Sequence, residues 1–153
     1  MPQPPVRLLP DPDQHELLGQ TLERVNRACN AARTRLLERG VHDPSGVARG
    51  ELRSVVKEEL DRFKLPSPFV TPSVERVAAS LRRQRFSTYQ SLTLPAGAFR
   101  WGGADRVTLP TWAGRRTVRA YVDPLRGGLR PPLEGRAATL VYRNGEFELV
   151  EAG

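Results

Sequence analysis

Residues 107–122 read Val-Thr-Leu-Pro-Thr-Trp-Ala-Gly-Arg-Arg-Thr-Val-Arg-Ala-Tyr-Val, and the expectations for the rest of the chain start from this stretch. After a turn predicted at Ala113 and Gly114, side chains of a strand alternate between two faces. The small apolar residues share one face: Val118, Ala120 and Val122. The polar residues share the other: Thr117, Arg119 and Tyr121. The stretch therefore predicts a β-strand with one buried face and one exposed, basic face.

The exposed face of this strand is expected to bind a polyanion. Guanidinium groups suit bidentate phosphate contacts, and aromatic rings suit the stacking of bases. The candidate residues are the tryptophan before the turn, the arginines at it and the side chains that follow: Trp112, Arg115, Arg116, Arg119 and Tyr121. The pattern predicts a nucleic-acid-binding surface, and we expect RNA to occupy it.

The composition of the chain agrees with this expectation. The 153 residues fit one domain or two small ones, with a net charge of +7 and 39% hydrophobic residues. Nucleic acid is the leading partner of so basic a chain, although a charge carried almost entirely by arginine also follows from GC-rich coding DNA. One cysteine and two histidines exclude an internal disulfide framework and a structural zinc site, so no cofactor is expected. Without a signal peptide or an apolar run, a cytoplasmic protein with no membrane partner is expected.

A long helix is predicted over residues 11–40, after a short strand at residues 6–9. Asp11 is placed to cap the helix, with Pro12 at its first position and Gln14 completing a capping box. Apolar residues then recur at spacings of four and three up to Gly40. Two asparagines flank this seam: Asn26 and Asn30. They face solvent, or they bind a partner such as nucleic acid or a neighbouring segment; the sequence leaves both possibilities open.

Two shorter helices follow, one ending before Pro66 and one opening at Thr71-Pro72. In the third helix four arginines are expected to face outward: Arg76, Arg82, Arg83 and Arg85. The last three either contact nucleic acid or complement the helix dipole. At the start of this helix, Ser73 and Arg76 are candidates for contact with DNA. Alternatively, Thr71 is simply the helix N-cap.

The remainder of the chain, from about Leu92, is predicted to be β-rich. Residues 123–132 are expected to form a loop rich in proline, glycine and arginine. Asn144-Gly145 between two alternating runs predicts a type I′ hairpin. Its two-residue loop places Tyr142 opposite Phe147 and Leu140 opposite Leu149, all on one face. The sequence therefore predicts an α+β fold in which a three-helix bundle is inserted between β segments.

Several blocks of this sequence resemble the OrfB or TnpB proteins of bacterial insertion sequences. Residues 7–14, Arg-Leu-Leu-Pro-Asp-Pro-Asp-Gln, are followed by Leu22, Asn26 and the trio Ala28-Cys29-Asn30, as at the opening of those proteins. Later blocks agree in order: Val107-Thr-Leu-Pro-Thr, Gly114-Arg-Arg-Thr-Val and Ala138-Thr-Leu-Val-Tyr-Arg-Asn-Gly-Glu-Phe. The resemblance spans nearly the whole chain but only the N-terminal part of the family's proteins.

This resemblance implies a fold and a function. The family consists of RNA-guided DNA nucleases, related to type V CRISPR effectors, in which a β-rich wedge domain interrupted by a helical recognition domain precedes a RuvC nuclease. By resemblance, residues 1–10 and 92–153 form a small, antiparallel, β-barrel-like wedge domain, and residues 11–91 form the recognition-like insertion. The expected function is a transposon-associated module that binds the guide RNA scaffold and target-flanking DNA.

No enzymatic activity is expected of this chain. A RuvC-like site needs converging carboxylates that hold two metal ions, and the chain ends where the family's nuclease begins. Its later acidic residues are scattered and are better explained by solubility: Asp105, Asp123, Glu134 and Glu148. Two alternatives stay open, a protein-interaction subunit or inhibitor of a RuvC nuclease supplied in trans, and a truncated remnant without function.

Overall fold

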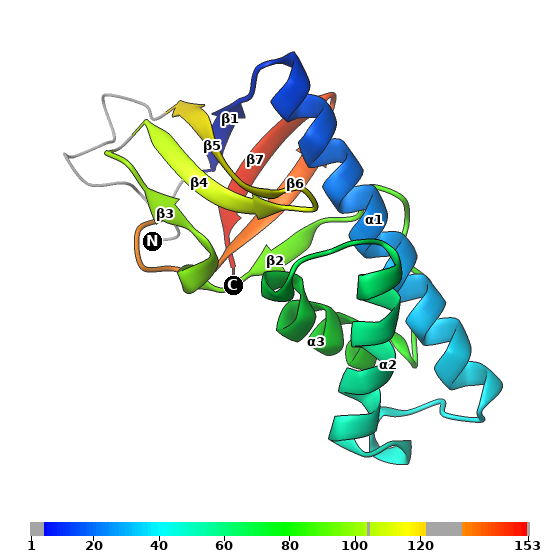
Figure 1. Ribbon diagram of the computed structural model, residues 1–153. Helices are drawn as coiled ribbons and strands as arrows, with labels where there is room; N and C mark the ends of the chain where they lie inside the picture. Colours follow the sequence, from blue (N-terminus) through cyan, green and yellow to red (C-terminus); the bar gives the residue numbers. More distant parts are fainter. Residues whose placement is uncertain (1–4, 104, 122–132, 153) are drawn as a thin grey trace.

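The computed structural model describes residues 5–103, 105–121 and 133–152 and has an α+β fold, which confirms the predicted class (Figure 1). Its sheet is antiparallel, with seven strands in the order β2-β6-β7-β1-β5-β4-β3. The strands are β1 (Val6–Leu9), β2 (Leu92–Leu94), β3 (Arg100–Trp101), β4 (Arg106–Thr111), β5 (Gly114–Tyr121), β6 (Ala138–Arg143) and β7 (Glu146–Glu151). Because β2 and β3 are edge strands, the described sheet is open and not a closed barrel.

The short strand β1 joins the centre of the sheet, as the sequence predicts for residues 6–9. It pairs with β5, where Leu8 lies opposite Ala120, and with β7, where Val6 lies opposite Leu149. Val6 and Leu8 are buried, while Arg7 and Leu9 face the other side. Segments that precede and follow the helices in the sequence therefore build one sheet.

Two hairpins set the register of the sheet. In the β6–β7 hairpin, Tyr142 pairs with Phe147 and Leu140 with Leu149, which confirms the predicted register. Asn144 and Gly145 both have positive φ, 54° and 78°, as a type I′ turn requires. In the β4–β5 hairpin, Thr111 pairs with Gly114, so the turn is one residue earlier than predicted.

The long helix α1 (Pro12–Glu38) begins with the predicted capping box between Asp11 and Gln14. It ends just before Gly40, whose φ of 81° takes the chain out of the helix. Figure 1 shows α1 running from the sheet, beside which its first turns lie, to the other two helices. The same helix thus covers the sheet with one half and the helical part with the other.

Helices α2 (Arg49–Arg62) and α3 (Val70–Ser80) pack against the second half of α1. Helix α3 follows a 3₁₀ turn at Ser67–Phe69, and Phe69 occupies its cap position without a side-chain hydrogen bond. Thr71 is therefore not the N-cap; its hydroxyl instead accepts a hydrogen bond from Arg53. The predicted start of the third helix at Thr71 is one residue from the observed start at Val70. The predicted cap is wrong, because the 3₁₀ turn at Ser67–Phe69 leads directly into the helix and places Phe69 at the cap position.

Buried side chains form one continuous cluster from the inner side of the sheet to the three helices. The division of the chain into two domains stays a prediction. The predicted loop at residues 123–132 and the position of Val122 lie outside the described residues. Among the helices of the described residues, none has the length and apolarity needed to cross a bilayer.

Candidate nucleic-acid interface

One side of the sheet, across β1, β5, β4 and β3, carries basic and aromatic side chains toward solvent. We call it the outer sheet face, and its residues are Arg7, Leu9, Arg100, Arg106, Thr108, Arg115, Thr117, Arg119 and Tyr121. The intervening residues are buried: Val6, Leu8, Val107, Leu109, Val118 and Ala120. The predicted alternation along β5 is confirmed, because Val118 and Ala120 are buried while Thr117, Arg119 and Tyr121 are exposed.

Two arginines lie directly opposite each other on this face. Arg106 of β4 pairs with Arg119 of β5, and both side chains are exposed. Within the described residues neither guanidinium has a hydrogen bond or an ion pair, and the same holds for Arg100. Gly102 lies beside Arg106 on the side away from β5, and it has no side chain that could shield the Arg106 charge. Like charges directly across a strand pair are destabilising, so this pair is a place where an anion would be favourable.

Two other cations of the outer sheet face, Arg7 and Arg115, are already engaged. Arg7 forms an ion pair with Glu146, and Arg115 donates a hydrogen bond to the carbonyl of Ala98 over 3.2 Å. Both remain exposed, so they add to the positive potential of the face. Among the described residues, the arginines of this face without a partner are Arg100, Arg106 and Arg119, and the last two lie directly opposite each other.

The apolar part of this face adjoins the arginine pair. Tyr121 is 54% exposed and Leu9 is 39% exposed. Tyr121 pairs with Arg7, and Leu9 pairs with Arg119, so the ring and the leucine lie diagonally across β1 and β5. Diagonal neighbours of this kind are within reach of an aromatic side chain. The face therefore combines a cationic half with an adjacent aromatic and aliphatic half.

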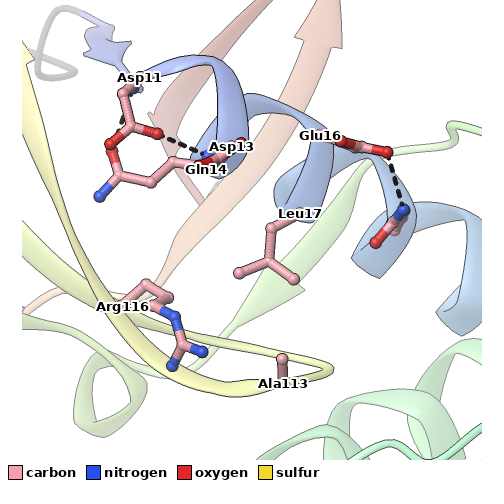
Figure 2. A pocket seen from close by; sticks show the side chains of 8 residues that line it. Asp11, Asp13, Gln14, Glu16, Leu17, Ala113 and Arg116 are labelled. Carbon is pink, nitrogen blue, oxygen red and sulfur yellow. Dashed lines mark hydrogen bonds between the residues drawn. The ribbon is translucent and has the colours of Figure 1, made fainter.

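Arg116 does not belong to this face. Since side chains alternate along β5, it projects to the side opposite Arg115. It lines an open groove with the first turns of α1, where Asp11, Asp13 and Glu16 are its acidic neighbours (Figure 2). The prediction that Arg115 and Arg116 share one surface is therefore wrong.

Trp112 is also not part of an exposed stacking surface. The guanidinium of Arg24 lies 3.8 Å from the centre of its ring, and the indole N–H donates to Gln20 over 3.0 Å. Arg24 also donates to the carbonyl of Phe63 over 2.9 Å. These contacts fasten the β4–β5 turn to α1 and to the end of α2, so the ring has a structural role.

The two asparagines of α1 hold a neighbouring segment, which decides between the alternatives left open by the sequence. Asn26 is 1% exposed, and its amide donates to the carbonyls of Thr88 and Gln90, each over 3.0 Å. Asn30 donates to the carbonyl of Phe86 over 2.8 Å and accepts from its N–H over 2.7 Å. Both asparagines are therefore used inside the protein and do not face a nucleic acid.

Arg76 reaches into the same network and does not face outward. It donates to Asn26 over 2.6 Å and to the carbonyl of Ser91 over 3.2 Å, and it lies 4.4 Å from the ring centre of Phe86. Burial lowers the pKa of Arg76, while the nearby Cys29 opposes that shift. Burial likewise raises the pKa of the Cys29 thiol, against the effect of the Arg76 charge.

Ser73 is fully buried, with an exposed fraction of 0%. Ser73 and Arg76 are the two residues at the start of α3 that were predicted to contact DNA. Neither is available for that contact, because Ser73 is buried and Arg76 bonds within the network. Replacing these two residues would disturb packing, so the pair cannot report on DNA binding alone.

The arginines after α3 are exposed, as predicted. Arg82 forms an ion pair with Asp43. Arg83 and Arg85 have exposed side chains, and the main-chain carbonyl of Arg83 accepts from Arg33 over 2.6 Å. Because α3 ends at Ser80, all three follow the helix and are not part of its last turn. They remain candidates for a secondary phosphate contact.

Sequence reasoning missed Arg100 and Arg106 as members of the interface. Arg106 immediately precedes the apolar Val107, and extending the alternation by one residue would have placed it beside Thr108 on the exposed side. Its position opposite Arg119 depends on the turn at Trp112-Ala113, which was predicted one residue too late. Arg100 is in a two-residue strand that no sequence pattern marks.

Comparisons with known proteins add nothing to this geometry, since no protein-family model, no curated protein and no solved structure matches the chain.

Proposed function

We propose that this protein is a nucleic-acid-binding module that binds RNA through the outer sheet face. The observation that carries the proposal is the exposed pair of Arg106 and Arg119, which lack acidic partners among the described residues. A phosphate between the two guanidinium groups would replace their mutual repulsion with two charge-assisted hydrogen bonds. The net charge of +7 adds a long-range attraction toward polyanions.

The resemblance to OrfB and TnpB proteins suggests the biological setting. We propose that the sheet corresponds to the wedge domain of that family and the helices to its recognition domain. The RNA would then be a guide scaffold, and target-flanking DNA would be a second partner. A role as an interaction subunit of a RuvC nuclease supplied in trans is the alternative that the experiments below would favour if RNA does not bind.

The double variant Arg106→Gln, Arg119→Gln is expected to bind RNA more weakly and with a flatter salt dependence. Each phosphate contact with a single strand contributes about 0.7 to the slope of log affinity against log salt, so losing two should flatten the slope by about 1.4. Fluorescence anisotropy titrations at several salt concentrations measure both quantities.

A charge-matched control is available on the helices. Arg39→Gln with Arg49→Gln removes the same net charge, but these arginines are paired with Glu51 and Glu75. This control should retain nearly the wild-type slope. If both double variants flatten the slope equally, the binding is diffuse and not located on the outer sheet face. Wild-type affinity and slope in the first variant would refute the assignment.

We further propose that the chain alone does not cut DNA. Within the described residues, no group of three or more histidine, cysteine, aspartate or glutamate side chains is arranged to hold a metal ion. Incubation of the purified protein with single- and double-stranded DNA in Mg²⁺ or Mn²⁺ should leave both substrates intact. Metal-dependent cutting that is abolished by replacing one acidic residue would overturn this proposal.

A further inference from the structure

The outer sheet face has two adjoining halves that suit different parts of a nucleotide. Tyr121 and Arg119 project from the same side of β5, two residues and about 6.6 Å apart. Arg106 adds a second guanidinium directly across from Arg119, and Leu9 extends the apolar side. A phosphate and the base attached to the same chain segment could therefore engage both halves together.

From this arrangement we infer that the outer sheet face binds unpaired RNA, with a base stacked on Tyr121 and adjoining phosphate held between Arg106 and Arg119. The inference rests on the proposed function and specifies its ligand. In a duplex both faces of each internal base are covered by its neighbours in the stack, so only an unpaired base can offer a face to an exposed ring. A tyrosine that is 54% exposed beside two unpaired arginines is suited to that ligand.

The same face carries two hydroxyl groups suited to contact with ribose. The hydroxyls of Thr108 and Thr117 are 2.7 Å apart and share one hydrogen bond. Only one of the two protons is used in that bond, so the second hydroxyl can donate to a 2′-hydroxyl. The 2′-hydroxyl is the group by which a protein distinguishes RNA from DNA, and this position lies between Arg119 and Arg115 on β5.

Base identity should matter little at this site. In this arrangement the guanidinium groups contact phosphate and a threonine hydroxyl contacts ribose, so the Tyr121 ring is the group left to contact a base. Stacking on a ring tolerates any base, and phosphate contacts carry no direct sequence information. The site is therefore expected to select for an unpaired strand and for ribose, with only weak sequence preference.

The test compares RNA and DNA oligonucleotides of equal length, each as a single strand and as a duplex, by anisotropy. Single-stranded RNA should bind the wild-type protein most tightly. Tyr121→Leu should weaken its binding by on the order of 5- to 100-fold while leaving the salt slope unchanged, and Tyr121→Phe should restore binding. Tyr89→Leu is the matched control, because Tyr89 is 47% exposed but lies outside this face.

The outcomes separate this inference from the proposed function. If duplex RNA binds as tightly as the single strand, or if Tyr121→Leu has no effect, the inference fails. The proposed function still stands in that case if Arg106→Gln with Arg119→Gln weakens binding. Tighter binding of single-stranded DNA than of RNA overturns the assignment to RNA. If no oligonucleotide binds, or if the arginine variant has no effect on binding, the proposed function itself fails.

Discussion

Replacing Asn26 by Ala is expected to lower the free energy of unfolding by about 3–5 kcal/mol, because the buried Asn26 side chain makes three hydrogen bonds, one of them to a charged guanidinium, and all three are lost together. The carbonyls of Thr88 and Gln90 lose their donor, and the guanidinium of Arg76 loses an acceptor at 2.6 Å. A neutral hydrogen bond contributes about 0.5–1.5 kcal/mol, and one to a charged group contributes about 1.5–3 kcal/mol. Urea denaturation followed by circular dichroism measures the loss.

Asn30→Ala provides the matched control on the same helix. Asn30 bonds the main chain of Phe86 but is only partly buried, so water can replace much of what the variant removes. We expect a loss of about 1 kcal/mol there. Equal losses in the two variants would show that the network around Asn26 and Arg76 contributes no more than an ordinary surface hydrogen bond.

Phe147→Ala is expected to be similarly destabilising, by about 3–5 kcal/mol, because it opens a cavity between the sheet and α1. Phe147 is fully buried on β7, and its ring lies 4.7 Å from Tyr142 and 5.1 Å from His15, centre to centre. Gly19 of α1 approaches the same ring. Thermal and urea unfolding of the variant would measure the cost.

Phe147→Leu should be much milder, because it keeps most of the buried volume at this position. Tyr121→Ala removes a ring of comparable size from the exposed face and should change stability by less than about 1 kcal/mol. If Phe147→Ala were as mild as Tyr121→Ala, the packing of α1 against the sheet would contribute little to stability.

The two sets of predictions also separate folding from binding. Asn26 and Phe147 are interior residues whose replacement acts on stability. Arg106, Arg119 and Tyr121 are exposed, so their replacement should act on RNA binding with little effect on unfolding. A loss of RNA binding in the exposed variants is therefore interpretable without correction for misfolded protein.

Local patterns were sufficient for much of the fold. The capping box at Asp11, the Asn144-Gly145 turn and the alternation along β5 each act within a few residues, and each was predicted from the sequence. The placement of β1 in the sheet also followed, because a lone short strand has no stable alternative. These features depend on local backbone geometry and on the spacing of hydrophobic residues, and both can be read from a short stretch of sequence.

The interface could be predicted only in part. Arg115, Arg119 and Tyr121 are on the outer sheet face, as alternation indicated, whereas Trp112 and Arg116 are not. Trp112 is covered by a residue of α1 that is far from it in sequence. The alternation of side chains along a strand predicts which face a residue lies on. It does not predict which distant segment will cover that face.

The sequence by itself therefore determined the three helices, the cap of α1, the Asn144-Gly145 turn and the buried side of β5. Only the tertiary structure decided that Asn26 is buried, that Arg76 bonds it within the fold, and that Arg106 lies opposite Arg119. The physical reason is that a polar side chain is stable either in water or in a buried site that satisfies its hydrogen bonds. Which of the two it occupies depends on the segment packed against it, here the carbonyls of residues 88–91, and that proximity exists only after folding.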